Sequence, residues 1–272
     1  MMSPQLPQGF AAVDGGEDPH AFVSYVDAVS ALSSAQAYKQ LTLLMLRVGE
    51  GARVLDVGCG TGDDARALAQ VVGPRGWVVG IDNSRTMIEE ATRRQNGLGL
   101  PVEFYVGDAY QIAFPDEVFD ACRADRVFQH LREPKKALSE MIRVTRSGGR
   151  IVVSDPDWGT FIVNSPDRDL TRRIVGFACD ATTDGWMGRQ LPGLFREVGL
   201  QDVQVRTSLV VIEEYDTAKE VLGIEWLAHG AAQAGVITSG EAERWLRGLQ
   251  EDHAAGRFTC GLGGFITSGV KP

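Results

Sequence analysis

The chain has 272 residues, 44% of them hydrophobic and 23% charged, which suits one large α/β domain with insertions. Its net charge of −9 and the lack of a Lys/Arg block argue against a nucleic-acid substrate. No apolar run reaches the roughly 18 residues of a membrane span. The four cysteines lie far apart, as is typical of reduced thiols in a cytoplasmic protein rather than of a disulfide frame.

The N-terminal part of the chain divides into two predicted segments. Residues 1–19 are rich in Pro, Gly and acidic residues, which predicts a flexible tail. Apolar residues then recur every three or four positions over residues 20–48, which predicts one or two helices that act as a lid. Residues 49–272 form the main predicted domain, with helical insertions at about 160–190 and 217–254.

Strands and helices alternate through the first half of that domain, which predicts βαβ units and a parallel sheet. The expected strands there are 53–58, 77–82, 102–108, 119–125 and 150–155, and the expected helices are about 64–72, 84–99 and 134–145. The later expected elements are helices over 167–181, 189–200, 217–234 and 239–254 and strands over 203–215 and 258–272. The two closing strands suit a seven-stranded, mostly parallel sheet with helices on both faces and an antiparallel edge strand.

A glycine-rich turn, GCGTG at residues 58–62, joins the first strand to the next helix. Glycines at such a turn allow a tight bend and close approach of the backbone to a ligand. Asp82 ends the second strand, where an acidic side chain can bind ribose hydroxyls. Asp63 stands where a dinucleotide-binding turn has its third glycine. An acid there repels a pyrophosphate and favours a sulfonium or ammonium ligand, which argues against an NAD-dependent oxidoreductase.

The segment VLDVGCGTG, residues 54–62, resembles the first motif of class I S-adenosylmethionine-dependent methyltransferases. Four further segments match motifs of that family: Gly80–Ser84, Gly107–Ala109, Phe119–Asp120 and Arg146–Arg150. The resemblance covers about residues 35–155 and is greatest to the small-molecule branch of ubiquinone/menaquinone and natural-product methyltransferases, although Ser147 stands where that branch usually has Pro. It implies a Rossmann-like fold and S-adenosylmethionine as the cofactor.

The resemblance also implies which residues hold this cofactor. The glycine turn would hold its methionine part, Asp82 the ribose, and Asp108 with Ala109 the adenine. The expected cofactor-binding residues are Tyr25, Asp56, Gly58, Gly60, Asp63, Asp82, Asn83, Met87, Asp108, Ala109 and Arg123. No cluster of His, Cys, Asp or Glu has the spacing of metal ligands, so no metal is expected.

Polar residues after the fourth and fifth strands are candidates for the acceptor side, because ligands lie beyond the carboxyl ends of parallel strands. His130 and Asp155 are candidate general bases, and Arg126 is a candidate to bind an acidic or carbonyl group. Two alternatives stay open: His130 as a hydrogen-bonding residue at a helix start, and Arg126 in a salt bridge with Asp125 or Asp155.

We expect the acceptor pocket between residues 126–130, residues 155–158 and the helices within 167–235. The predicted activity is methyl transfer to an O, N or C atom of a small organic acceptor, such as a natural product or a quinone-like compound. An enzyme of the same fold that binds the cofactor but catalyses cyclisation or elimination remains an alternative. Either a monomer or a homodimer is compatible with the sequence.

Overall fold

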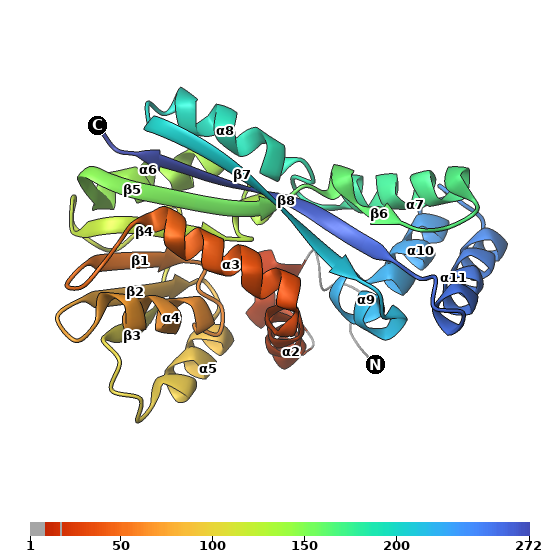
Figure 1. Cartoon of the computed structure of the whole chain (residues 1–272), viewed down its shortest axis with the longest axis horizontal. Helices are drawn as coiled ribbons and strands as arrows, with labels where there is room; N and C mark the ends of the chain where they lie inside the picture. Colours follow the sequence, from red (N-terminus) through yellow and green to blue (C-terminus); the bar gives the residue numbers. More distant parts are fainter. Residues whose placement is uncertain (1–8, 17) are drawn as a thin grey trace.

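The computed structural model describes residues 9–16 and 18–272 and has one sheet at its centre (Figure 1). The strands are β1 (Arg53–Val57), β2 (Trp77–Asp82), β3 (Val102–Val106), β4 (Phe119–Asp125), β5 (Thr145–Pro156), β6 (Ile162–Val163), β7 (Gln201–Ile212) and β8 (Cys260–Val270). Their order is β3-β2-β1-β4-β5-β8-β6, and β7 pairs with the other side of β8. Strands β1 to β5 are parallel, whereas β8 is antiparallel to β5 and to β7. This confirms the predicted fold class, and the two-residue β6 is the strand that the sequence did not predict.

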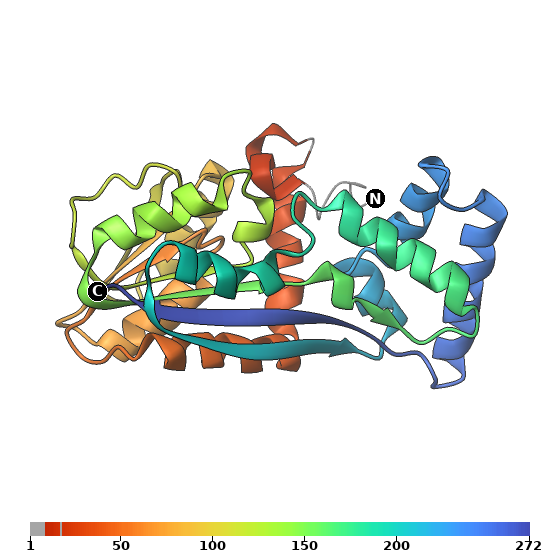
Figure 2. The ribbon, with the colours of Figure 1, turned by 90° about the horizontal axis from the view of Figure 1, so that it is seen from above.

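The helices cover both faces of this sheet and also form a group beyond its end. They are η1 (Phe10–Gly15), α2 (Pro19–Ala31), α3 (Ser33–Leu46), α4 (Asp63–Val72), α5 (Arg85–Gln95), η2 (Phe128–His130), α6 (Pro134–Val144), η3 (Trp158–Thr160), α7 (Arg168–Ala181), α8 (Met187–Glu197), α9 (Tyr215–Val221), α10 (Ile224–Gln233) and α11 (Ser239–Ala254). Figure 2 shows α3 on one side of the sheet and α6 and α8 on the other. Helices α7, α9, α10 and α11 pack together past the end of β5 (Figure 1). No helix in the described part of the chain has both the length and the apolar character needed to cross a membrane.

Apolar side chains fill both faces of the parallel strands, because successive residues of a strand point to opposite sides. Val54 of β1 belongs to the same buried cluster as Leu68 of α4. Its neighbour Leu55 belongs to the cluster on the other face, with Leu138 of α6 and Phe195 of α8. All five side chains are fully buried, so each layer of helices is fixed to the sheet by close packing.

The segment predicted to be a flexible tail contains structure in its described part. Residues 10–15 form η1, whereas residues 1–8 and 17 of that prediction lie outside the described residues. The ring of Phe10 packs edge-on against Phe22, with 5.0 Å between centroids. The carboxylate of Asp14 accepts hydrogen bonds from the Ser84 hydroxyl and the Arg85 backbone N–H, both at 2.7 Å, at the start of α5. These tertiary contacts, which composition does not reveal, order the segment.

The predicted lid over residues 20–48 consists of two helices with different surroundings. Helix α3 is tied to the sheet, because Lys39 forms ion pairs with Asp64 and Asp125. Helix α2 instead packs against η1, α5 and α9, and Figure 2 shows η1 and α2 between the sheet and the helical group. Of the two predicted lid helices, α3 is thus fixed to the sheet, and α2 lies beside η1.

The single helix predicted over residues 217–234 is two helices, α9 and α10, in the structure. Gly223 separates them with φ of +63°, in the left-handed region where an α-helix cannot continue. The break lets α9 pack against α2 while α10 packs against α7 and α11.

Candidate functional site

A cavity of about 510 Å³ lies over the carboxyl ends of β1, β2 and β4, below η1 and α2. Its size falls within the roughly 300–1,000 Å³ typical of ligand pockets. Of the expected cofactor-binding residues, the following line it: Tyr25, Asp56, Gly58, Gly60, Asp82, Asn83, Met87, Asp108, Ala109 and Arg123. Asp63 is not among the lining residues, and its carboxylate forms an ion pair with Arg66. The neighbouring Asp64 lines the cavity instead.

The glycines of the turn after β1 have different structural roles. Gly58, Gly60 and Gly62 all have positive φ values, of +69°, +52° and +81°. A Cβ on Gly58 would lie 2.3 Å from a methyl of Val127, and one on Gly62 would lie 2.5 Å from the Phe104 ring, so both glycines allow close packing of the turn. A Cβ on Gly60 would meet no described protein atom closer than 4.0 Å. Gly60 therefore leaves free space at the cavity wall where a ligand can approach the backbone.

Asp82, at the end of β2, holds the turn in place and also lines the cavity. One of its oxygens accepts a hydrogen bond from the Gly60 N–H and the other from the Ser84 N–H, both at 2.9 Å. Burial raises the pKa of this carboxyl, and the backbone hydrogen bonds oppose the rise. A carboxylate has about four acceptor positions, so each oxygen keeps capacity for a further donor such as a sugar hydroxyl.

A buried ion cluster forms the floor of the cavity. The Arg123 guanidinium lies 3.0 Å from an Asp56 oxygen, 2.9 Å from Asp64 and 3.3 Å from Asp125. Lys39 also pairs with Asp64 and Asp125, so two cations face three carboxylates. Burial raises the pKa of Asp56 to about 6, with Arg123 opposing the rise. Burial would also raise the pKa of Asp64, but Arg123 and Lys39 hold it well below its usual range.

His130 lines the same cavity, with its ring stacked on Phe10 at 5.6 Å between centroids. Burial and the nearby charge of Arg126 lower the pKa of His130 to about 3. The imidazole is therefore neutral and only weakly basic near pH 7, which favours a packing or positioning role over a role as general base.

Asp155, at the end of β5, does not line the large cavity but a smaller one. Its carboxylate accepts hydrogen bonds from the N–H groups of Phe128 and Gln129, both at 3.1 Å, and so holds η2 against β5. Burial raises the pKa of this carboxyl well above its usual range. By tying η2 to the end of β5, these hydrogen bonds give Asp155 a structural role.

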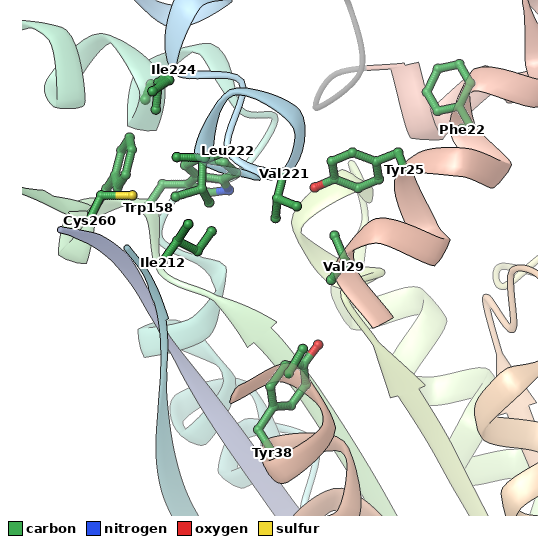
Figure 3. Packing of buried hydrophobic residues seen from close by; sticks show 14 of the residues in the cluster. Phe22, Tyr25, Val29, Tyr38, Trp158, Ile212, Val221, Leu222, Ile224 and Cys260 are labelled. Carbon is green, nitrogen blue, oxygen red and sulfur yellow. The ribbon is translucent and has the colours of Figure 1, made fainter. Parts of the chain in front are cut away.

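The smaller cavity, of about 50 Å³, lies between the end of β5, α2 and α9 and is largely apolar. Arg126, Asp155 and Trp158 line it, as do Tyr25 and Leu222. Figure 3 shows Tyr25 and Val29 of α2 facing Val221, Leu222 and Trp158. The structure thus brings together three of the residues expected around the acceptor, while His130 lies in the other cavity.

Comparison with known proteins gives a consistent family assignment. The model of the methyltransferase domain family matches residues 49–183. The chain is 37% identical over 238 residues, 87% of its length, to an uncharacterized 37.1 kDa protein in a transposon of Streptomyces fradiae, of which it covers 67%. It is 32% identical to the ubiquinone/menaquinone biosynthesis C-methyltransferase UbiE of Burkholderia cenocepacia, over 53% of this chain and 64% of that protein. It thus matches less than two thirds of that quinone methyltransferase.

The chain belongs to the Rossmann-like, S-adenosylmethionine-dependent methyltransferases. The fold of this methyltransferase agrees with that of the YcgJ protein from Bacillus subtilis, with a TM-score of 0.60 at 19% identity. That alignment covers 87% of this chain and 98% of the other.

The cavity of this methyltransferase fits the charge of its cofactor, which carries an ammonium and a sulfonium group. One oxygen of Asp56 and one of Asp125 are buried and accept no hydrogen bond from the described residues. Both carboxylates line the cavity, and together with Asp64 they outnumber the cations of the cluster. An ammonium group supplies the donors and the positive charge that these oxygens lack.

Some residues at this site were not predicted from the sequence. Lys39 and Asp64 line the cavity through the ion cluster, and Phe10 covers it from a segment predicted to be a tail. A partial signal existed for Asp64, which directly follows Asp63 at the helix start. Arg123 was expected to bind the cofactor, and the structure shows that its side chain forms the centre of the ion cluster. Among the described residues, no group of three or more His, Cys, Asp and Glu side chains is arranged to hold a metal ion.

Replacing Gly60 with alanine is expected to weaken binding of S-adenosylhomocysteine at least tenfold, measured by calorimetric titration. The added methyl would stand in the free space where the ligand approaches the turn. Gly51 provides a matched control, since it also has positive φ, of +80°, and an added Cβ there meets no atom within 4 Å. Gly51→Ala should cost about 1 kcal/mol of stability through the same backbone strain and leave the affinity unchanged. Equal affinities for the two variants would contradict this role of Gly60.

The affinity for S-adenosylhomocysteine is expected to fall as the pH drops through about 6. Protonation of Asp56, whose pKa burial raises to about 6, removes a charged acceptor for the ligand's ammonium group. Affinity should therefore be highest above this pH and decrease below it, in titrations between pH 5 and 8. The same titrations with Asp56→Asn should show a flatter profile. A wild-type affinity independent of pH would contradict the assignment of Asp56 to the ammonium group.

Proposed function

We propose that this methyltransferase transfers the methyl group of S-adenosylmethionine to an O, N or C atom of a small organic acceptor. The observation that carries the proposal is the acid-lined cavity beside the glycine turn, where one buried oxygen each of Asp56 and Asp125 accepts no hydrogen bond from the described residues. The apolar lining of the second cavity suits the body of a natural product or a quinone-like compound, which the cavity would have to widen to admit. The Burkholderia relative, named as a ubiquinone/menaquinone C-methyltransferase, supports the latter.

The residues of the chain would act mainly by binding and alignment. When bound, S-adenosylmethionine supplies an activated methyl group. Asp82 would hold the ribose, Asp108 and Ala109 the adenine, and Asp56 and Asp125 the ammonium group. His130, with its lowered pKa, is a weak base, and Asp155 lines only the second cavity, where its carboxylate holds η2 against β5. Holding the acceptor in line with the methyl group and excluding water is itself a large source of rate acceleration.

Transfer of isotope from methyl-labelled S-adenosylmethionine tests this function directly. The protein would be incubated with a panel of phenols, quinols, amines and carboxylic acids, and the products analysed by mass spectrometry. We expect the labelled methyl group to appear in at least one acceptor, together with S-adenosylhomocysteine. If an acceptor is cyclised or loses a group while the label stays in the cofactor, the result would instead support an enzyme of this fold that catalyses cyclisation or elimination.

We propose that η1 and α2 form the mobile cover of the site, whereas α3 stays fixed. The cover residues Phe10, Tyr25 and Val29 line the cavity, and α3 is held by the ion pairs of Lys39. Hydrogen–deuterium exchange with and without S-adenosylhomocysteine should show new protection over residues 19–31 and none over residues 38–46. Equal exchange of α2 in both states would contradict a mobile cover.

The cellular setting is also a proposal. A cytoplasmic location agrees with four cysteines that are free in the structure. We infer a monomer or a homodimer as the working form, and sedimentation in solution would distinguish the two.

A further inference from the structure

The side chain of Arg126 lies where the two cavities meet. Arg126, Tyr25 and Val29 are the residues that line both of them. Arg126 follows the carboxyl end of β4, and its backbone N–H donates to the carbonyl of Ser154 at 2.7 Å. Its φ of +60° lies in the left-handed region, which is unfavourable for a residue with a side chain. Backbone strain of this kind is often found at binding sites, where it fixes the direction of a side chain.

The guanidinium of Arg126 has no carboxylate partner within 4.0 Å among the described residues. It donates one hydrogen bond, to the Tyr25 hydroxyl at 2.6 Å, and lies over the Tyr25 ring at 5.4 Å from the centroid. Of the two acids weighed as partners from the sequence, Asp125 is held by Lys39 and Arg123, and Asp155 accepts two backbone N–H groups. The salt bridge left open as the alternative role of Arg126 is therefore absent from the described structure.

The two cations in the floor of the large cavity differ from Arg126 in having carboxylate partners, and Arg132, which also lines this cavity, is exposed. Lys39 and Arg123 each pair with carboxylates of the buried cluster. The neutral His130 adds no charge beside Arg126. A half-buried guanidinium without an anion is unfavourable, and Tyr25 accepts a hydrogen bond from only one of its five N–H donors. An anionic oxygen at this position would relieve that cost.

We propose that Arg126 and Tyr25 form a binding site for an anionic oxygen of the methyl acceptor, either a carboxylate or an ionised hydroxyl on an apolar body. The proposal rests on the function proposed above and names the class of its acceptor. Val29, Leu222 and Trp158 line the second cavity and would contact the apolar body. The assignment concerns binding and holds whether this oxygen or another atom of the acceptor receives the methyl group.

The size of the second cavity adds a structural requirement. At about 50 Å³ it holds little more than a few waters. A ring enters it only if α2 moves away from α9, against which it packs. Because Tyr25 lies on α2, binding of an anion at Arg126 and closure of α2 over the acceptor would occur together.

Three small aromatic probes test the proposal: 4-nitrobenzoate, 4-nitrophenol at a pH where it is ionised, and uncharged nitrobenzene. Their dissociation constants would be measured on the full chain, saturated with S-adenosylhomocysteine. We expect at least one anion to bind the wild type roughly 10- to 100-fold more tightly than nitrobenzene, as a charge-assisted hydrogen bond implies. The anion that shows this preference identifies the class as carboxylate or ionised hydroxyl.

Arg126→Met should abolish the preference for the anion. Tyr25→Phe, which keeps the aromatic ring, should reduce the preference roughly 2- to 10-fold. This variant provides a second test of the anion site if Arg126→Met folds poorly. Arg132→Met is the matched control, because Arg132 also lines the large cavity but is exposed, and it should keep the preference. Wild-type protein without preference for either anion, or a preference that survives in Arg126→Met, would overturn the proposal. Failure of the wild type to bind S-adenosylhomocysteine would instead overturn the proposed function, and the probes would still report on Arg126 in its absence.

Discussion

Replacing Asp82 with alanine is expected to weaken binding of S-adenosylhomocysteine by roughly 30- to 1,000-fold while the protein remains folded. The carboxylate lines the cavity at the end of β2 and would accept two charge-assisted hydrogen bonds from the ribose hydroxyls. Together such bonds contribute about 2–4 kcal/mol, which corresponds to this range of affinity. Calorimetric titration of the variant and the wild type would measure the difference.

The stability of the variant needs a separate control, because Asp82 also accepts the N–H groups of Gly60 and Ser84. Asp120 is a suitable match, since its carboxylate accepts the Arg53 backbone N–H at 2.7 Å at the opposite end of the sheet. Asp120→Ala should lower the melting temperature comparably and leave the affinity unchanged. Wild-type affinity in Asp82→Ala would remove this residue from the cofactor site.

Replacing Arg123 with methionine is expected to lower the free energy of unfolding by about 3–5 kcal/mol. The arginine side chain is 2% exposed and contacts three carboxylates, Asp56, Asp64 and Asp125. Its loss leaves three buried acids with Lys39 as the remaining cation of the cluster. Urea denaturation monitored by circular dichroism would measure the loss.

Arg146 provides the matched control for this experiment. It pairs with Asp120, but its side chain is 55% exposed, so Arg146→Met should cost no more than about 1 kcal/mol. Equal losses in the two variants would show that the buried cluster is not a major source of stability. Weaker binding of S-adenosylhomocysteine in Arg123→Met is also expected, because Asp56 and Asp125 would lose their fixed positions.

The parallel part of the fold could be predicted from the sequence because its signals are local. Short apolar runs that end at aspartate, such as residues 77–82, predicted strands whose bounds agree with the structure, but the fifth strand begins at Thr145 and not at the predicted residue 150. The turn at residues 58–62 also pointed to the large cavity that Gly58 and Gly60 line, since glycine spacing after a strand constrains the backbone directly. The break at Gly223 was missed, because a glycine within a helical pattern does not by itself show whether the helix continues.

The ion cluster and the cover of the site could not be predicted, because both depend on contacts between distant segments. Lys39 meets Asp125 only after α3 packs on the sheet. The choice between Asp63 and Asp64 depends on the rotation of α4, where one residue shifts a side chain by about 100° around the helix. Asp14 orders η1 through the start of α5, some 70 positions away in the sequence, which no local pattern indicates.

The central claim is that the cavity over β1 and β2 is the methyl-donor site. Calorimetric titration of the wild-type protein with S-adenosylhomocysteine, in the presence of a chelator, tests this claim most directly. The account predicts binding of one ligand per chain that chelation does not weaken, because the contacts come from the glycine turn and the carboxylates of Asp56, Asp82 and Asp125. Absence of binding, or binding only after a metal ion is added, would contradict it.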